Sequence, residues 1–203
     1  MYLFRLIQTS LITLAEIEAT AVIQRLADSG FHYHNLDHTR GVVGVTRLLA
    51  QDLGCDDHTT ELLAIAAWFH DTGYDDMERH EMESARLAKE FLERNACSAV
   101  DIESVSAIIL ATNIHAEPQN LAEQIIRDAD LHYLGVEDYY PRANRLRDEW
   151  EITQKRQLSD EEWYRLNLTF FNTHRFYTNA GEARFGQQKE RNKKSIELKL
   201  AQL

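Results

Sequence analysis

The sequence is poor in the two residues that make tight turns, with only 8 Gly and 2 Pro among 203 residues. Sheet-rich folds depend on such turns, and runs of Val, Ile and Thr in strict alternation are also missing, so a predominantly β fold is disfavoured. Cysteine is scarce as well. Cys55 and Cys97 stand far apart and belong to no CxxC or zinc-knuckle spacing, so we expect a reduced, cytoplasmic setting.

Long apolar runs and excess positive charge are also lacking. No window approaches the roughly 18 apolar residues that cross a bilayer, and the first residues do not resemble a signal peptide. The net charge of −11 makes binding of an extended nucleic acid unfavourable. A small phosphorylated ligand is still compatible with this charge, because a bound metal ion supplies positive charge locally.

Apolar residues recur at helical spacing along most of the chain, which predicts an all-α fold of roughly nine helices. The length suits one helical domain, residues 1–203, around a substantial core. Asn35 is a candidate N-cap, and Ser159 begins a capping-box pattern. We expect one helix from about Met77 to Arg94 and a last helix from Ala183 to the C-terminus.

Histidine and aspartate gather near the expected helix ends. His70 and Asp71 end an apolar helix before Gly73, and at a final helical turn two adjacent side chains can converge on one ion. Imidazole nitrogen and carboxylate oxygen together suit a borderline divalent metal. Repeated histidine at such positions is costly unless it is paired or coordinated, so a shared metal site is the simplest explanation. The candidate residues are His34, His38, His70, Asp71, His80, His115, Asp128 and Asp130.

The order of these residues resembles a known family. Tyr33 to His38 (YHNLDH), then His70-Asp71, then Asp130 in Ala-Asp-Leu is similar to the His…His-Asp…Asp signature of the HD-domain superfamily. The resemblance covers about residues 31–135 and implies an all-α, metal-dependent phosphohydrolase. It assigns metal binding to His38, His70, Asp71 and Asp130. The C-terminal segment, residues 136–203, lies outside it and is expected to complete the core and shape the pocket.

Three further roles follow from the resemblance. The Tyr-His-Asn-x-x-His run is similar to that of cyclic-nucleotide phosphodiesterases, in which the first histidine protonates the leaving oxygen, so His34 is a candidate general acid. The alternative is a hydrogen-bonded residue at the helix start. His80 and His115 resemble the ligands of a second ion in members with two metals. Asp71 would then bridge the two ions and join His34 as a catalytic residue. Without a second ion, His80 and His115 would contact phosphate oxygens.

Two departures from the family patterns narrow the substrate. The residues after His70-Asp71 lack the Glu-Asp continuation of the stringent-response nucleotide hydrolases. Ala116 stands where the cyclic di-nucleotide phosphodiesterases have a second, tandem histidine. We therefore predict hydrolysis of a nucleotide or another small phosphoester with one or two divalent ions. The sequence does not distinguish among Mn, Mg, Fe, Zn, Ni and Co as the bound metal. It is compatible with a homodimer.

Two alternatives are kept. One is a di-iron oxygenase resembling inositol oxygenase, built from the same six ligands, although only ten residues separate His70 from His80. The other is a non-catalytic, metal-stabilised module that binds a nucleotide or a protein.

Several polar residues have simpler expected roles. We expect a solvated face or surface position for Asp128, His32, His58, Arg127 and the basic stretch Lys189–Lys194, and a structural or exposed position for His132 and His174.

Overall fold

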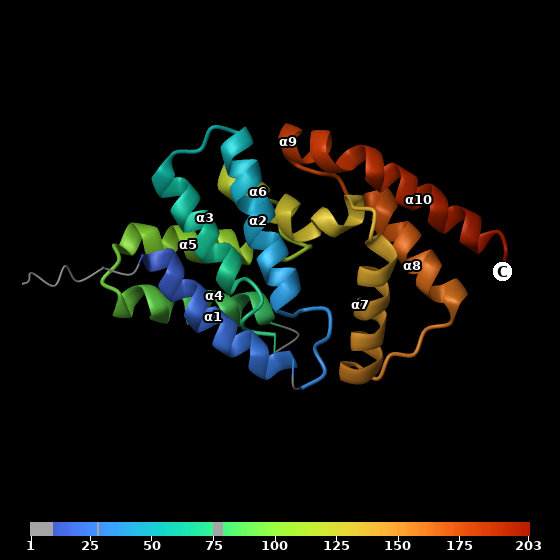
Figure 1. Ribbon diagram of the computed structural model, residues 1–203, viewed down its shortest axis with the longest axis horizontal. Helices are drawn as coiled ribbons and strands as arrows, with labels where there is room; N and C mark the ends of the chain where they lie inside the picture. The colour runs from blue at the N-terminus through green and yellow to red at the C-terminus, as the bar shows by residue number, and fades with distance from the viewer. Residues whose placement is uncertain (1–9, 28, 75–78) are drawn as a thin grey trace, which may run out of the picture.

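The structure is a computed structural model that describes residues 10–27, 29–74 and 79–203, and these residues form helices and no strand (Figure 1). This confirms the all-α prediction. Helices α9 and α10 join through the π-helical turn η2 without a break, so they form one rod beside α1–α8, in agreement with roughly nine helices. The elements are α1 (Leu11–Ala27), α2 (Leu36–Asp52), α3 (Asp57–Phe69), α4 (His80–Arg94), α5 (Ala99–Leu110), α6 (Leu121–Asp130), the 3-10 helix η1 (Leu131–Gly135), α7 (Tyr139–Thr153), α8 (Asp160–Thr173), α9 (Asn179–Gly181), η2 (Glu182–Gly186) and α10 (Gln187–Leu200).

Local capping explains where several helices begin. The side chain of Asn35 accepts hydrogen bonds from the backbone N–H groups of Asp37 (2.9 Å) and His38 (3.0 Å), as predicted for an N-cap. The capping box at Ser159 is also present. The last helical rod begins at Asn179 rather than at Ala183, because Thr178 caps it. The predicted start near Met77 lies outside the described residues.

The hydrophobic residues form two clusters. The first lies among α1–α6 and includes Phe69, Phe91 and Ile109. The second is built mainly by η1, α7, α8 and α10 and includes Trp163 and Phe171. In Figure 1, α7, α8 and α10 stand beside the α1–α6 bundle, and η1 connects the two groups. The C-terminal third therefore has apolar contacts of its own.

Asp128 ties the C-terminal segment to α6, contrary to the solvated position that we expected for it. The residue is fully buried, and its carboxylate accepts hydrogen bonds from the backbone N–H of Tyr177 (2.7 Å), from the backbone N–H of Thr178 (2.8 Å) and from the hydroxyl of Thr178 (2.7 Å). Gly181 must be glycine here, because a Cβ at this position would lie 2.4 Å from the Asp128 carboxylate. The prediction was wrong because the partners of Asp128 lie 50 residues away in the sequence.

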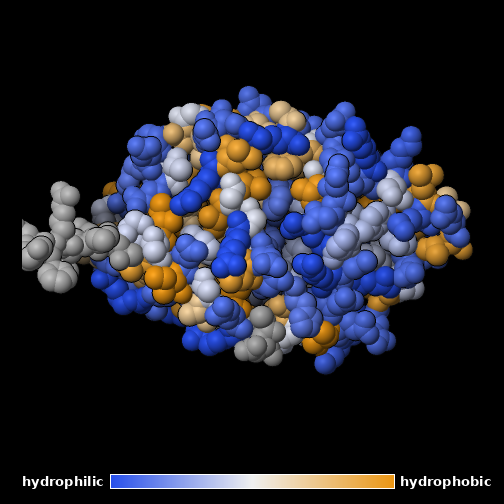
Figure 2. All heavy atoms as spheres, in the orientation of Figure 1, coloured by the Kyte–Doolittle hydropathy of each residue, from blue (hydrophilic) through white to orange (hydrophobic). Residues whose placement is uncertain are grey.

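The surface is predominantly polar. Figure 2 shows one face on which hydrophilic residues surround scattered hydrophobic ones. None of the helices within the described residues combines the length and apolar character needed to cross a bilayer.

Candidate metal centre and adjoining cavity

Three helix ends bring four predicted ligands together. His38 lies in the first turn of α2, His70 and Asp71 directly follow α3, and Asp130 is the last residue of α6. Helices α2, α3 and α6 pack against one another, so these ends meet at one place. The turn after Asp71 is held by Gly73, whose N–H donates to the Ser84 hydroxyl at 2.9 Å.

The four side chains converge on one small volume. Nε2 of His38 lies 3.3 Å from Nε2 of His70 and 3.3 Å from Oδ2 of Asp71. Nε2 of His70 lies 3.0 Å from that same oxygen. Oδ1 of Asp130 is 3.3 Å from Nε2 of His38 and 3.6 Å from Nε2 of His70. His38, His70 and Asp71 are all buried, and their ligand atoms lie within 4.8 Å of one another.

This arrangement fits a divalent metal ion. Two ligand atoms about 2.1 Å from an ion and at right angles to each other are about 3.0 Å apart, close to the separations found here. The Nδ1–H of His70 donates to the backbone carbonyl of Ala67 at 2.8 Å, which directs the lone pair of Nε2 toward the carboxylates. Oδ2 of Asp71 is buried without a hydrogen-bond partner, and coordination would satisfy it.

The charges of these four side chains also favour a bound cation. Burial lowers the pKa of His38 and His70, but the carboxylates of Asp71 and Asp130 outweigh it, so both histidine pKa values are raised, that of His70 strongly. Burial raises the pKa of Asp71 and Asp130, but the facing imidazoles outweigh it and lower both. The carboxylates are thus ionised and draw protons onto the imidazoles, and a divalent cation can replace those protons.

A family model for the HD domain matches residues 35–132, the segment that contains all four of these side chains. Residues 35–132 therefore form an HD domain. A crystal structure of a protein from Lactobacillus plantarum, a Northeast Structural Genomics target, is similar to it with a TM-score of 0.72 at 18% sequence identity. The similarity covers 97% of this chain and 98% of that chain, so the shared fold extends well beyond residue 132. No curated protein matches the sequence significantly. The HD domain is typical of the superfamily of metal-dependent hydrolases.

His34 lies beside the HD-domain ligands and is held by the C-terminal part of the chain. Its Nδ1 is 2.5 Å from Oε1 of Glu149, a fully buried residue of α7. The other oxygen of Glu149 accepts hydrogen bonds from the backbone N–H groups of Tyr33 (2.8 Å) and His34 (3.0 Å). The His34 ring stacks on Tyr74 with centroids 3.7 Å apart. A carboxylate partner makes Nδ1 the donor, which leaves Nε2 of His34 for the adjoining cavity.

The sequence reasoning missed Glu149. In the sequence it looks like one charge among many in the segment Arg145-Leu-Arg-Asp-Glu-Trp-Glu151. One signal could have singled it out. Glu149 shares the spacing of the apolar residues Ala143 and Leu146, so it lies on the buried stripe of α7, where an unpaired charge is costly.

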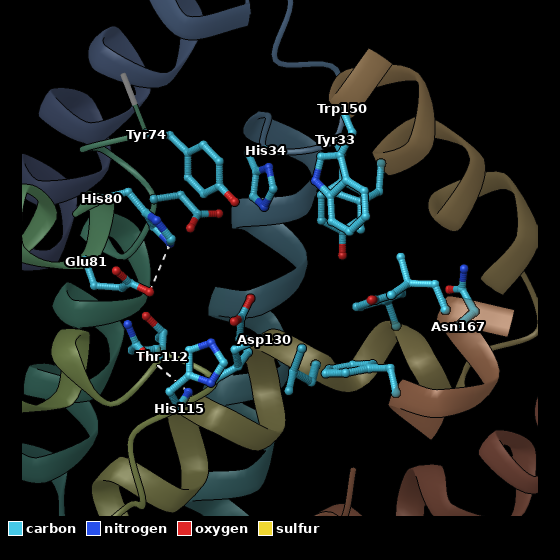
Figure 3. A pocket seen from close by; sticks show the side chains of 18 of the residues that line it. Tyr33, His34, Tyr74, His80, Glu81, Thr112, His115, Asp130, Trp150 and Asn167 are labelled. Carbon is cyan, nitrogen blue, oxygen red and sulfur yellow. Dashed lines mark hydrogen bonds and ion pairs between the residues drawn. The ribbon is translucent and has the colours of Figure 1, made fainter. Parts of the chain in front are cut away.

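A cavity of about 480 Å³ adjoins the metal centre (Figure 3). Asp71, Asp130 and His34 form part of its lining, so two of the candidate ligands and the candidate acid face one space. In Figure 3, His80, Glu81, Thr112 and His115 lie on one side of this space, and Trp150 and Asn167 lie on the other. The cavity is thus bounded by the HD domain on one side and by α7 and α8 on the other.

His80 and His115 line this cavity but stand apart from the buried ligand group of the described residues. Nε2 of His80 lies 3.3 Å from Oε1 of Glu81. His115 is exposed, and its backbone N–H donates to the side chain of Asn113 at 2.9 Å. Both are placed where they could reach the phosphoryl group of a bound substrate, and their role as ligands of a second ion stays a prediction.

Two basic residues expected to be solvated are buried instead. Arg127 donates to the backbone carbonyls of Ala111 (2.7 Å), Asn113 and Ala116 (3.0 Å), so it holds the loop that carries His115. Lys189 donates to the backbone carbonyl of His174 at 2.6 Å. Their partners lie elsewhere in the sequence, so the expectation was wrong for both.

Two histidines expected to be structural or exposed lie inside the protein. His132 is buried, and its Nδ1–H donates to the carbonyl of Ala129 at 2.6 Å. His174 is partly buried, and its ring packs against Phe170 and Phe176. Burial lowers the pKa of both, to about 4 for His132 and about 3 for His174. Both positions fit the structural role that we expected.

Proposed function

We propose that the protein hydrolyses a small phosphoester with one or two divalent ions held by His38, His70, Asp71 and Asp130. The observation that carries this proposal is the convergence of these four side chains beside a cavity that Asp71 and Asp130 help to line. A divalent ion supplies Lewis-acid polarisation of the phosphoryl group and makes water a better nucleophile. Nucleotides are one class of substrate that this reaction admits.

His34 is the residue best placed to protonate the leaving oxygen. It lines the cavity beside Asp71, and Glu149 fixes its tautomer so that Nε2 faces the substrate. The carboxylate also stabilises the imidazolium that donates the proton. The stacked Tyr74 ring restrains rotation of the imidazole. In this reaction the water oxygen bonds to phosphorus, the bond from phosphorus to the leaving oxygen breaks, and that oxygen takes the proton from His34. A proton of the attacking water, released from the phosphate product, then restores the imidazolium.

The test is release of inorganic phosphate from p-nitrophenyl phosphate by protein that has been stripped with a chelator and reloaded with single metals. We expect activity to return with at least one divalent metal and to be lost in the His70→Ala variant. His58→Ala is the matched control, because the exposed His58 only pairs with Asp101 at 2.9 Å, away from the cavity. Equal activity of His70→Ala and His58→Ala would contradict the proposal.

The two alternatives have separate readouts. A di-iron oxygenase needs His80 and His115 as ligands, whereas the structure leaves both outside the buried group in the described residues. Oxygen consumption by the iron-loaded protein would favour it. Metal binding without turnover of any phosphoester or uptake of oxygen would favour the non-catalytic module.

A further inference from the structure

The two walls of the cavity differ in chemistry. The wall from the HD domain carries carboxylates and imidazoles, including Asp71, Asp130 and His34. The opposite wall carries aliphatic and aromatic side chains from two helices of the C-terminal part (Figure 3). Its members are Leu146 and Trp150 from α7, and Trp163, Leu166 and Phe170 from α8.

The apolar wall offers a ligand little hydrogen bonding. Apart from the indole N–H groups of Trp150 and Trp163, its polar side chain is Asn167, and both ends of that amide are engaged inside the protein. Its oxygen accepts from the hydroxyl of Tyr139 at 2.7 Å, and its nitrogen donates to the backbone carbonyl of Trp163 at 2.7 Å. Trp150 and Trp163 meet edge to face with ring centroids 5.7 Å apart. Such a surface gains free energy by covering hydrocarbon or an aromatic ring, and it loses free energy when it covers unpaired polar groups.

The cavity also lacks fixed cationic side chains. None of the residues that line it in the described part of the chain is Lys or Arg, whereas Asp71, Glu81 and Asp130 are acidic. Arg127 is committed to three backbone carbonyls. The guanidinium carbon of Arg156 lies 5.0 Å from the centroid of the Trp150 ring, but Arg156 is not part of the cavity lining. Positive charge for a phosphoryl group thus comes from the metal centre and the histidines at one end, which limits the charge that the cavity can neutralise.

We propose that the substrate is a phosphomonoester with a single phosphoryl group and an apolar, aryl- or alkyl-bearing organic part that lies against Leu146, Trp150, Leu166 and Phe170. This inference rests on the proposed function and narrows it. The phosphoryl group lies at the metal end beside His34. Hydrolysis breaks the bond from phosphorus to the ester oxygen, transfers the proton of His34 to that oxygen, and yields inorganic phosphate and an apolar alcohol. Nucleoside polyphosphates are disfavoured because the apolar wall would leave their polar groups unpaired and because the cavity lining lacks the positive charge to neutralise them.

The experiment compares kcat/KM of the metal-loaded protein for two monoesters with similar leaving oxygens and for a nucleoside triphosphate. 2-Phenylethyl phosphate and glycerol 3-phosphate are both alkyl monoesters but differ in polarity, and adenosine triphosphate adds charge. We expect 2-phenylethyl phosphate to exceed glycerol 3-phosphate by at least about tenfold, with adenosine triphosphate slowest. Equal rates, or preference for glycerol 3-phosphate or adenosine triphosphate, would overturn the inference and leave the proposed function intact.

Two variants on α8 localise the effect. Leu166→Asn places an amide on the apolar wall, and Leu168→Asn makes the same change at a half-buried position that does not line the cavity. Leu166→Asn should lower kcat/KM about tenfold for 2-phenylethyl phosphate and less than twofold for glycerol 3-phosphate. Leu168→Asn should change the two values by the same factor. An equal loss for both substrates in Leu166→Asn would overturn the assignment of this wall.

A binding measurement separates failure of this inference from failure of the proposed function. If no phosphoester is hydrolysed, calorimetric titration with 3-phenylpropylphosphonate, which resembles 2-phenylethyl phosphate but has no ester oxygen, still tests the wall. Binding that weakens about tenfold in Leu166→Asn and is unchanged in Leu168→Asn supports the ligand class without the reaction. No binding, or equal binding to both variants, rejects it.

Discussion

The two walls of the cavity come from parts of the chain that differ in how much their local sequence reveals. The HD-domain wall is made by residues at helix ends that follow the order of the family signature, and the family model covers all of its candidate ligands. The opposite wall belongs to residues 136–203, where the apolar side chains and Glu149 are scattered over two helices. The HD-domain wall indicates the class of reaction that we propose, and the opposite wall indicates the class of substrate.

The two walls are not fully separate, because a hydrogen bond of the proposed general acid joins them. Glu149 comes from the C-terminal part and reaches His34, which comes from the motif. In the reaction that we propose, the C-terminal part therefore contributes to the chemistry as well as to ligand selection. Substitutions of His34 and of Glu149 measure how far the HD domain and the C-terminal part depend on each other.

The largest expected effect is that of His34→Ala. Removing the general acid should lower kcat by roughly 10²- to 10⁴-fold for an alkyl phosphate, because the leaving oxygen must then depart without a proton. Metal content should be unchanged, since His34 lies outside the buried ligand group of the described residues. Phosphate release and elemental analysis on the same preparation check both points. Unchanged kcat would leave His34 as a hydrogen-bonded residue at the helix start.

The next largest effect is expected for Glu149→Gln. The amide keeps the size of the side chain but does not stabilise an imidazolium, so kcat should fall by roughly 10- to 100-fold. In the His34→Ala background the same change should cost little more, because the two residues act as one unit. Independent, multiplicative losses in the double variant would show that Glu149 acts by holding the backbone of residues 33 and 34 rather than through the imidazole.

A smaller effect on stability is expected for Arg127→Lys. The single ammonium group of lysine cannot donate to all three backbone carbonyls of the loop that carries His115, as the guanidinium group does. The free energy of unfolding should therefore fall by about 2 kcal/mol. Arg142→Lys is the control, because Arg142 pairs with Asp138 at the surface and should change by less than about 0.5 kcal/mol. Urea denaturation measures both. A loss no larger than that of the control would show that Arg127 does not hold the loop.

An effect on stability of similar size, but dependent on pH, is expected at His174. Its pKa is lowered to about 3 by burial, whereas an unfolded histidine titrates near 6.5. The neutral ring therefore stabilises the fold above pH 6.5, and this contribution is lost as pH falls from 6.5 toward 3. Between pH 6.5 and 4.5 the loss should amount to roughly 2 kcal/mol, and His174→Gln should show a flatter dependence in urea denaturation. Parallel curves for the two proteins would contradict the burial of a neutral ring.

The helices and the metal-binding end could be predicted because their signals are local. Asn35 caps α2 through residues two and three positions away, and His70-Asp71 follows an apolar helix that ends at Phe69. The other contacts join distant residues. Glu149 and His34 are 115 positions apart, and Asp128 and Thr178 are 50 apart. No local pattern predicts such pairs, which explains why Asp128, Arg127 and Lys189 were expected at the surface.

The central claim is that His38, His70, Asp71 and Asp130 hold a divalent ion. The most direct test is the metal content of His70→Ala and His80→Ala, measured by elemental analysis after identical loading and dialysis. We predict that the wild type retains at least one ion per chain, that His70→Ala loses it, and that His80→Ala keeps at least one. Full metal content in His70→Ala, or no metal in the wild type under any loading condition, would contradict the claim.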